Sequence, residues 1–230
     1  TMRVRYSSIP VVAAPRGLTL GGGCEICLHA DKVVAAAETY IGLVEVGAGV
    51  LPAGGGTKEL ALRASDGYYN GDVQVPALQN ALMNIATAKV ATSAHEAMEM
   101  GYFRKGLDRI VVNGDRVLAE AKKAVLELDA AGYTQPVERQ DILVLGRAAL
   151  GTFYTGVSSM KVAGYISDHD EHIAQKVADV ICGSDLSAPA KVSEQYLLDL
   201  ERKGFLELLT KRKSLERIQS ILKTGKPLRN

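Results

Sequence analysis

The sequence predicts an α/β fold followed by an all-helical C-terminal lobe. Two short apolar runs, Ile9 to Ala14 and Lys32 to Ala37, are typical of buried strands, and Cys24 to Ala30 between them is typical of a helix. Later in the chain, apolar residues recur in long stripes at helical spacing. The expected domains are therefore an α/β part over residues 1–133 and a helical lobe over residues 134–230.

Turn and cap residues predict the elements between these two strands and the lobe. The glycine-rich segment Pro52 to Thr57 leads into a helix, and Ile41 to Val50 is expected to be a loop or a short strand. Further helices are expected over Lys58 to Ala64, over Pro76 to Lys89, and from a capping box at Ser93 and Glu96 to a stop at Gly101. Leu107 to Val112 is expected to form another strand.

Three apolar stripes at helical spacing predict helices that face a core. Their members are Val117, Leu118, Ala121, Val125 and Leu128; then Ile173, Val177, Val180 and Ile181; and last Leu215, Ile218, Ile221 and Leu222. Gly183 and Gly225 are expected to end the second and third of these helices.

The composition is that of an ordinary soluble globular protein. Hydrophobic residues make up 47% and charged residues 23% of the 230 positions. The net charge of +1 produces no field that would attract nucleic acid or an anionic membrane. The first residues contain no apolar segment of a signal peptide, and no apolar run is long enough to span a bilayer. We therefore expect a reduced, cytoplasmic setting.

Three cysteines, Cys24, Cys27 and Cys182, argue against a disulfide framework. Cys24 and Cys27 have the Cys-x-x-Cys spacing of redox pairs and of half a zinc site. A structural zinc needs four ligands, and only His29 lies close by. Thiols packed on one helix are the simpler interpretation, and no metal site is expected.

Acidic and basic clusters in the lobe also have simple interpretations. Asp168-His169-Asp170-Glu171-His172 resembles a set of metal ligands, but Ser167 before it predicts a capped first helical turn. Lys211-Arg212-Lys213 is expected to be a solvated connection between helices.

Gly21, Gly22 and Gly23 lead directly into the helix that carries Glu25. Glycine lets the backbone approach a ligand closely, and the N–H groups of a helix start favour negative charge. This arrangement suits a phosphate or an oxyanion developing on a carbonyl, although a tight turn alone would also explain it. A dinucleotide fingerprint is excluded because Ile26 stands where its last glycine is required, and Ala53 to Lys58 resembles a phosphate loop only loosely.

Glu45 lies in the apolar stretch Ile41 to Gly47. A carboxylate there is either exposed by a turn or held in an apolar pocket. In a pocket its pKa rises, which suits proton transfer near neutral pH.

Taken together, these segments resemble the crotonase superfamily of enoyl-CoA hydratases and isomerases. The resemblance is carried by Pro10-Val11-Val12-Ala13-Ala14, by Leu20-Gly21-Gly22-Gly23-Cys24-Glu25, by Gly42-Leu43-Val44-Glu45-Val46-Gly47 and by Leu51-Pro52-Ala53-Gly54-Gly55-Gly56-Thr57. Ala94 to Val112 is similar to the family's helix-then-strand segment. The two glutamates are twenty positions apart, as in the hydratases.

The lobe resembles the bifunctional 3-hydroxyacyl-CoA dehydrogenase/enoyl-CoA hydratases of fatty-acid β-oxidation, in a form whose dehydrogenase precedes its hydratase. The ending Lys226 to Asn230 is similar to the C-terminus of that type. The family's early strands and its first oxyanion amide precede the segment at Pro10 and are absent here. We therefore expect a truncated crotonase core that has little or no activity by itself. Arg16 also departs from the family, which has a small polar residue before Gly17.

The resemblance implies hydration of a trans-2-enoyl-CoA to a 3-hydroxyacyl-CoA. Gly22 would supply one oxyanion N–H, flanked by Gly21 and Gly23 at the substrate. Glu25 would act as base on water and Glu45 would protonate C2, or the reverse, because a close pair titrates as a unit. The only expected small-molecule partner is the acyl-CoA substrate. NAD would belong to the absent dehydrogenase, and a homo-oligomer is expected.

Three other functions remain open from the sequence. An enoyl-CoA isomerase can work with one carboxylate, so the presence of Glu25 and Glu45 favours hydration. The chain could instead be an inactive piece that binds acyl-CoA or mediates oligomerisation. A redox module built on Cys24 and Cys27 is the third alternative.

Overall fold

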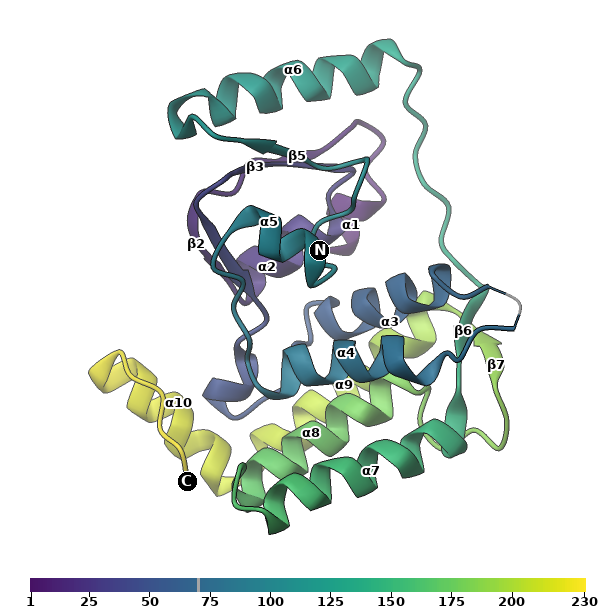
Figure 1. Cartoon of the computed structure of the whole chain (residues 1–230), viewed down its shortest axis with the longest axis vertical. Coiled ribbons are helices and arrows are strands. Elements are labelled where there is room, and N and C mark those ends of the chain that lie inside the picture. Colours follow the sequence, from purple (N-terminus) through teal and green to yellow (C-terminus); the bar gives the residue numbers. More distant parts are fainter. Residues whose placement is uncertain (70) are drawn as a thin grey trace. The chain divides into compact units, whose positions relative to one another are not determined.

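A computed structural model describes residues 1–69 and 71–230 (Figure 1). The chain forms two compact units, each built from two separate stretches of sequence. Unit 1 comprises residues 1–43 and 90–138, and unit 2 comprises residues 44–89 and 139–230. The second stretch of unit 1 ends at Glu138, and residues 44–89 group with the later helices. The division into domains at residue 133 stays a prediction.

Unit 1 is an α/β unit with two parallel sheets. Its strands are β1 (Val12–Ala13), β2 (Gly17–Leu20), β3 (Lys32–Ala36), β4 (Thr39–Gly42) and β5 (Arg109–Val111). Its helices are α1 (Met2–Arg5), α2 (Gly22–His29), α5 (Ala94–Glu99), the 3₁₀ turn η2 (Gly114–Arg116) and α6 (Val117–Ala130). One sheet has the order β1-β3-β5, and β2 pairs with β4 in the other.

Helix α6 lies along the three-stranded sheet, as Figure 1 shows. Val34 of β3 is buried against Ala121 and Ala124 of α6, with Val12 and Val111 at the edge of the cluster. These small side chains allow the helix to approach the sheet closely.

A buried carboxylate fixes the start of β3 in unit 1. Asp108 accepts hydrogen bonds from Val33 N–H at 2.7 Å and from Arg104 N–H at 2.6 Å. The guanidinium of Arg104 also reaches the carbonyl oxygens of Ala30 and Asp31, at 3.1 and 3.0 Å. Asp108 and Arg104 together therefore tie the loop before β5 to β3 and to the loop that precedes β3.

Unit 2 is a helical unit with one small sheet. Its helices are the 3₁₀ turn η1 (Glu45–Ala48), α3 (Gly56–Asp66), α4 (Val75–Ala86), α7 (Gly146–Val162), α8 (Asp168–Ile181), α9 (Glu194–Leu209) and α10 (Arg212–Thr224). Helix α8 packs against α3, α4, α7 and α9. Its stripe Ile173, Val177, Val180 and Ile181 is buried as predicted.

The fold class predicted from the sequence is confirmed, with one addition. Strands β6 (Ile142–Val144) and β7 (Ala190–Val192) form an antiparallel pair within the otherwise helical lobe. Neither strand was predicted from the sequence, because runs of three residues are too short for a periodicity to be recognised.

Several local predictions need correction. The run Ile9 to Ala14 contains only the half-buried two-residue strand β1, and Ile9 is 69% exposed. Leu118 and Leu222, which were predicted to face a core, are 76% and 80% exposed. Helical spacing shows which residues share one face of a helix, but it does not show where the partner surface lies. Ser93 caps α5, and the Glu96 carboxylate accepts a hydrogen bond from the N–H of Thr92, one residue before the cap.

Unit 2 buries an ion cluster around Lys58, whose side chain is 0% exposed. Its Nζ lies 2.9 Å from Glu194 Oε1 and 3.1 Å from Glu59 Oε2. A buried charge loses its hydration, so partners at these distances are required to offset that cost.

Among the described residues, no helix combines the length and apolar character needed to cross a membrane.

Replacing Glu194 by Gln should lower the free energy of unfolding by about 3–5 kcal/mol, because Lys58 keeps its charge and loses a partner in a dry environment. The matched control is Asp185→Asn, which breaks the ion pair between Asp185 and Arg147. The side chains of Arg147 and Asp185 are 63% and 68% exposed. The control should cost less than about 1 kcal/mol. Equal losses in urea titrations would contradict the assignment.

His169 in α8 should make stability depend on pH. Burial, followed by the positive charge of Arg217, lowers the pKa of His169 from 6.5 to about 4. Between these values the unfolded chain binds a proton and the folded chain does not, so stability falls as pH drops from about 6.5 to about 4.

The variant His169→Gln keeps an N–H donor and should flatten the dependence of the urea midpoint on pH over this range. The pKa of His172 is also lowered by burial, so a smaller slope should remain. His95→Gln, at an exposed position, is the control. An unchanged slope in His169→Gln would contradict the prediction.

Candidate functional site

The three glycines predicted at the substrate lie together at the start of α2. Gly21 precedes the helix with φ 56° and ψ −122°, a backbone conformation that is essentially restricted to glycine. Its N–H donates to Gly42 O at 2.9 Å, which ties the start of α2 to the end of β4. Gly22 and Gly23 form the first turn, where helix geometry leaves N–H groups without an intrahelical acceptor.

The space beside Gly22 is open. Gly22 is exposed, and a Cβ atom built on it would meet no atom within 4 Å. At Gly23 a Cβ would lie 3.6 Å from the Thr19 methyl group, which is an ordinary contact. A ligand oxygen can therefore approach the start of α2 from the side of Gly22.

Glu25 lies in the first turn of α2 and is only 6% exposed. Its N–H donates to Gly21 O at 3.0 Å, and its own carbonyl oxygen lies 2.7 Å from His29 Nδ1. Because a carbonyl only accepts, His29 Nδ1 carries the proton of this bond. The backbone on both sides of Glu25 is thus held firmly.

Glu45 opens the 3₁₀ turn η1 in unit 2 and is half-buried. The predicted loop or short strand over Ile41 to Val50 is thus the end of β4 followed by η1. Val46, next to Glu45, is buried at 4% exposure. Glu25 belongs to unit 1 and Glu45 to unit 2, so each is described within its own unit. That their carboxylates face each other stays a prediction.

The glycine-led start of α3 is already occupied. Glu201 of α9 accepts hydrogen bonds from Gly55 N–H at 3.0 Å and from Lys58 N–H at 2.5 Å, at the start of α3. The carboxylate supplies the negative charge that such a helix start favours. The loose resemblance of Ala53 to Lys58 to a phosphate loop therefore reflects an internal cap.

The cysteines and the acidic cluster have the simpler of their two interpretations. Cys24 and Cys27 are 0% and 4% exposed within α2, as expected for packed thiols. Ser167 caps the start of α8, as predicted, and Asp170 completes a reciprocal capping box with it. Within the described part of the chain, no group of three metal-binding side chains is assembled.

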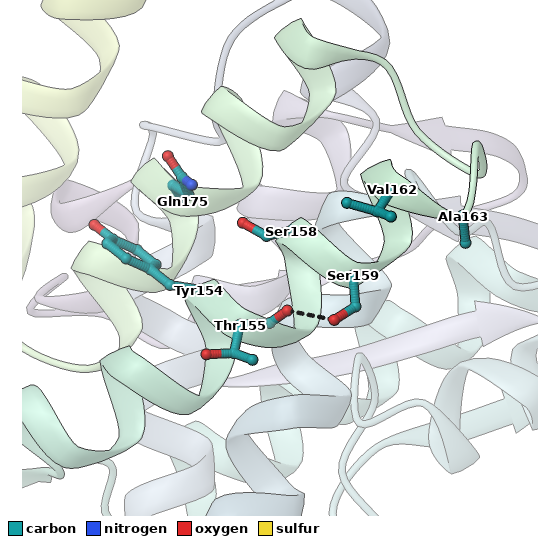
Figure 2. A pocket seen from close by; sticks show the side chains of 7 residues that line it. All are labelled: Tyr154, Thr155, Ser158, Ser159, Val162, Ala163 and Gln175. Atoms are coloured by element: carbon teal, nitrogen blue, oxygen red, sulfur yellow. Dashed lines mark hydrogen bonds between the residues drawn. The ribbon is translucent and has the colours of Figure 1, made fainter.

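A hollow of about 610 Å³ lies along α7 and α8 in unit 2 (Figure 2). Its lining residues are Tyr154, Thr155, Ser158, Ser159, Val162, Ala163 and Gln175. Among these described residues only Tyr154 is ionisable, and burial and a 2.7 Å bond to Asp179 raise the pKa of its phenol. The hollow therefore lacks a group suited to acid–base catalysis near neutral pH.

The contacts between α10 and the turn that contains Glu45 were not predicted from the sequence. Arg217 and Ser214 of α10 bond to carbonyl oxygens of the η1 region, at Val46 and Gly49. Neither residue has a sequence signal, because about 170 positions separate partners that only folding brings together.

Comparison with known proteins gives a consistent result. Residues 1–67 match the family model described as enoyl-CoA hydratase/isomerase. The chain is 44% identical over 229 residues to a Bacillus subtilis protein named "Probable 3-hydroxyacyl-CoA dehydrogenase", covering 100% of this chain and 28% of that protein. It is also 37% identical over 114 residues to crotonyl-CoA hydratase of Syntrophomonas wolfei, covering 50% of this chain and 37% of that protein.

Solved structures support the fold. An enoyl-CoA hydratase from Mycobacterium avium subsp. paratuberculosis has a TM-score of 0.57 at 17% identity, covering 100% of this chain and 68% of that one. A carnitinyl-CoA hydratase from Mycobacterium avium has a TM-score of 0.53 at 20% identity, covering 95% and 62%. The family match over residues 1–67 and the similarity to the Bacillus subtilis protein confirm the resemblance to the crotonase superfamily, and the solved structures agree with its fold.

Proposed function

We propose that this chain carries the paired carboxylates of an enoyl-CoA hydratase. The reaction adds water across the C2=C3 bond of a trans-2-enoyl-CoA and gives a 3-hydroxyacyl-CoA, a step of fatty-acid β-oxidation. One observation carries the proposal: Glu25, buried in the first turn of a glycine-led helix, and Glu45 both lie in the segment that matches the family. An isomerase needs only one such carboxylate, so the pair favours hydration.

The start of α2 would bind the thioester carbonyl oxygen. As water adds at C3, negative charge develops on that oxygen, and an N–H group aimed at it lowers the barrier. The Gly22 N–H is suited to this role because it is at an open helix start, where the helix dipole also favours negative charge. Cys24 and Glu25 then follow within the same rigid turn.

The two carboxyl groups would move the protons. Glu25 as carboxylate takes a proton from the water whose oxygen bonds to C3, and Glu45 as carboxylic acid gives its proton to C2. One water is consumed: one of its hydrogens passes to Glu25, the other stays on the new C3 hydroxyl group, and the proton that Glu45 gave up is now on C2. Proton exchange between the two groups then restores the starting state, and their roles can be interchanged because a close pair titrates together.

The chain spans 28% of the length of its Bacillus subtilis relative, so the activity of a whole protein is part of the proposal. That relative is named as a dehydrogenase of 3-hydroxyacyl-CoA, the product of hydration. We propose that the natural protein joins both activities, binds NAD outside this chain and forms a homo-oligomer. The cytoplasmic location stays a prediction.

In the natural full-length protein, Glu25→Gln and Glu45→Gln should each lower the kcat for crotonyl-CoA hydration by at least about 100-fold, because each removes a group that transfers a proton. Glu38→Gln, at an exposed position of unit 1, is the control and should retain full activity. The loss of absorbance of the conjugated thioester gives the rate, and circular dichroism gives the fold. If either variant keeps the parent kcat, the role of that carboxylate is wrong.

The same assay separates the alternative functions. Conversion of a 3-enoyl-CoA to a 2-enoyl-CoA without hydration would identify an isomerase. Acyl-CoA binding without turnover of either substrate would identify an inactive binding protein. Either result overturns the hydratase assignment.

Gly21→Ala should lower kcat by about 10-fold or more, because an L residue at φ 56° and ψ −122° would turn the start of α2 and move the Gly22 N–H. Gly17→Ala is a control at a similar φ of 64°, where a Cβ would meet no atom within 4 Å. It should reduce stability without a comparable fall in kcat. Equal kcat values for the two variants would argue against an oxyanion role for this turn.

A further inference from the structure

Helix α10 buries two side chains, and both are polar. Ser214 is 0% exposed and Arg217 is 1% exposed, whereas Leu215 and Leu222 on the same helix are 46% and 80% exposed. A surface helix usually buries an apolar stripe and leaves its polar residues in water. The reversed arrangement indicates that α10 makes specific polar contacts, and these contacts lead to the turn that carries Glu45.

Arg217 holds the beginning of η1. Its Nη1 donates to the carbonyl oxygen of Val46 at 3.0 Å and to Asp170 Oδ1 at 2.7 Å. Its Nε donates to Asn230 Oδ1 at 2.9 Å. The planar guanidinium is therefore fixed from several directions, and a lysine ammonium, which is a point charge, cannot reproduce this geometry.

Ser214 holds the residue that follows η1. Its Oγ lies 2.5 Å from Gly49 O and 3.0 Å from His169 Nε2. A carbonyl only accepts, so the single hydroxyl hydrogen goes to Gly49 and the serine oxygen accepts from His169 Nε2–H. His169 is itself 5% exposed in α8. Helices α8 and α10 together therefore fix the end of the turn.

The backbone of Gly49 is in close contact with α10. Gly49 has φ 84°, and a Cβ built on it would lie 2.7 Å from Ser214 Cα and 3.2 Å from Ser214 Cβ. Real Cβ atoms do not approach a backbone atom so closely, and only glycine fits. The turn and the helix are thus held by packing as well as by hydrogen bonds. Every group in this contact belongs to unit 2.

We propose that Arg217 and Ser214 are positioning residues for Glu45. They fix both ends of the four-residue turn of which Glu45 is the first residue. A short 3₁₀ turn has weak internal hydrogen bonds, so its orientation depends on outside contacts. A proton-transfer group displaced by about 1 Å loses about 100-fold in rate. This inference rests on the proposed hydratase function, because that function gives Glu45 its task.

The test compares Ser214→Ala and Arg217→Lys with two controls on the same helix, in the natural full-length protein. The controls are Ser220→Ala, which removes a bond to Lys226 O, and Arg212→Lys, at a side chain that is 90% exposed. With crotonyl-CoA, each test variant should lose at least about 10-fold in kcat while KM changes by less than about 3-fold. Both controls should match the unsubstituted protein. A displaced proton donor affects the transition state more than substrate binding, which predicts this split.

Amide hydrogen exchange tests the contact independently of activity. The N–H groups of Gly47 and Gly49 donate to Val44 O and Val46 O, at 3.0 and 2.9 Å. Their exchange should be at least about 5-fold faster in the test variants and unchanged in the controls. Ser214→Ala keeps the Arg217–Asp170 pair, so it serves as the milder variant if Arg217→Lys fails to fold.

The outcomes separate the two proposals. If the unsubstituted protein does not hydrate crotonyl-CoA, the proposed function is wrong, and Glu45 then has no proton transfer for which it must be positioned. If it does, and Ser214→Ala folds with unchanged kcat, only the positioning role is wrong. A fall in kcat with unchanged exchange at Gly47 and Gly49 would also overturn it, because the turn would then not have moved.

Discussion

The N–H groups at the start of a helix need an acceptor, and this requirement organises the chemistry of the chain. Helices α2 and α3 both begin after glycines, yet they meet it in different ways. At α3 the Glu201 carboxylate of α9 accepts from the backbone, which makes this start part of the interior. At the start of α2 the side of Gly22 is open, so a ligand oxygen can accept hydrogen bonds there, as the Glu201 carboxylate does at the start of α3. Two similar sequence patterns thus serve packing in one unit and a candidate oxyanion site in the other.

The two glutamates are held by unlike supports. Glu25 lies in an α-helical turn whose backbone bonds to Gly21 and His29, so its position follows from the helix that carries it. Glu45 lies in a 3₁₀ turn of four residues, which cannot fix a side chain alone. Its turn is held by α10, which belongs to the lobe. The lobe therefore has a chemical role in the proposed reaction as well as a packing role.

Unit 2 also buries several charged side chains, and each of them needs a partner. Lys58, Glu194, Glu201 and Arg217 are all at most 1% exposed, and each has a partner of opposite charge or a backbone group within hydrogen-bond distance. Such networks tolerate little displacement, because a buried charge without a partner is strongly unfavourable. They make unit 2 a rigid support for η1.

Features that depend on neighbouring residues could be predicted from the sequence alone. The buried stripe of α8, the cap at Ser167 and the glycine-led start of α2 follow from spacings of three to four positions, and local geometry fixes them. The two glutamates could also be predicted as site residues, because their flanking motifs are short and contiguous. Which surfaces meet depends on the whole folded chain and could not be predicted. In the folded chain, Leu118 and Leu222 are exposed and β6 pairs with β7. Glu201 accepts a hydrogen bond from Gly55 N–H, and Arg217 donates one to the carbonyl oxygen of Val46. These contacts join distant positions, and their energy depends on packing and desolvation in the folded chain, which no local pattern contains.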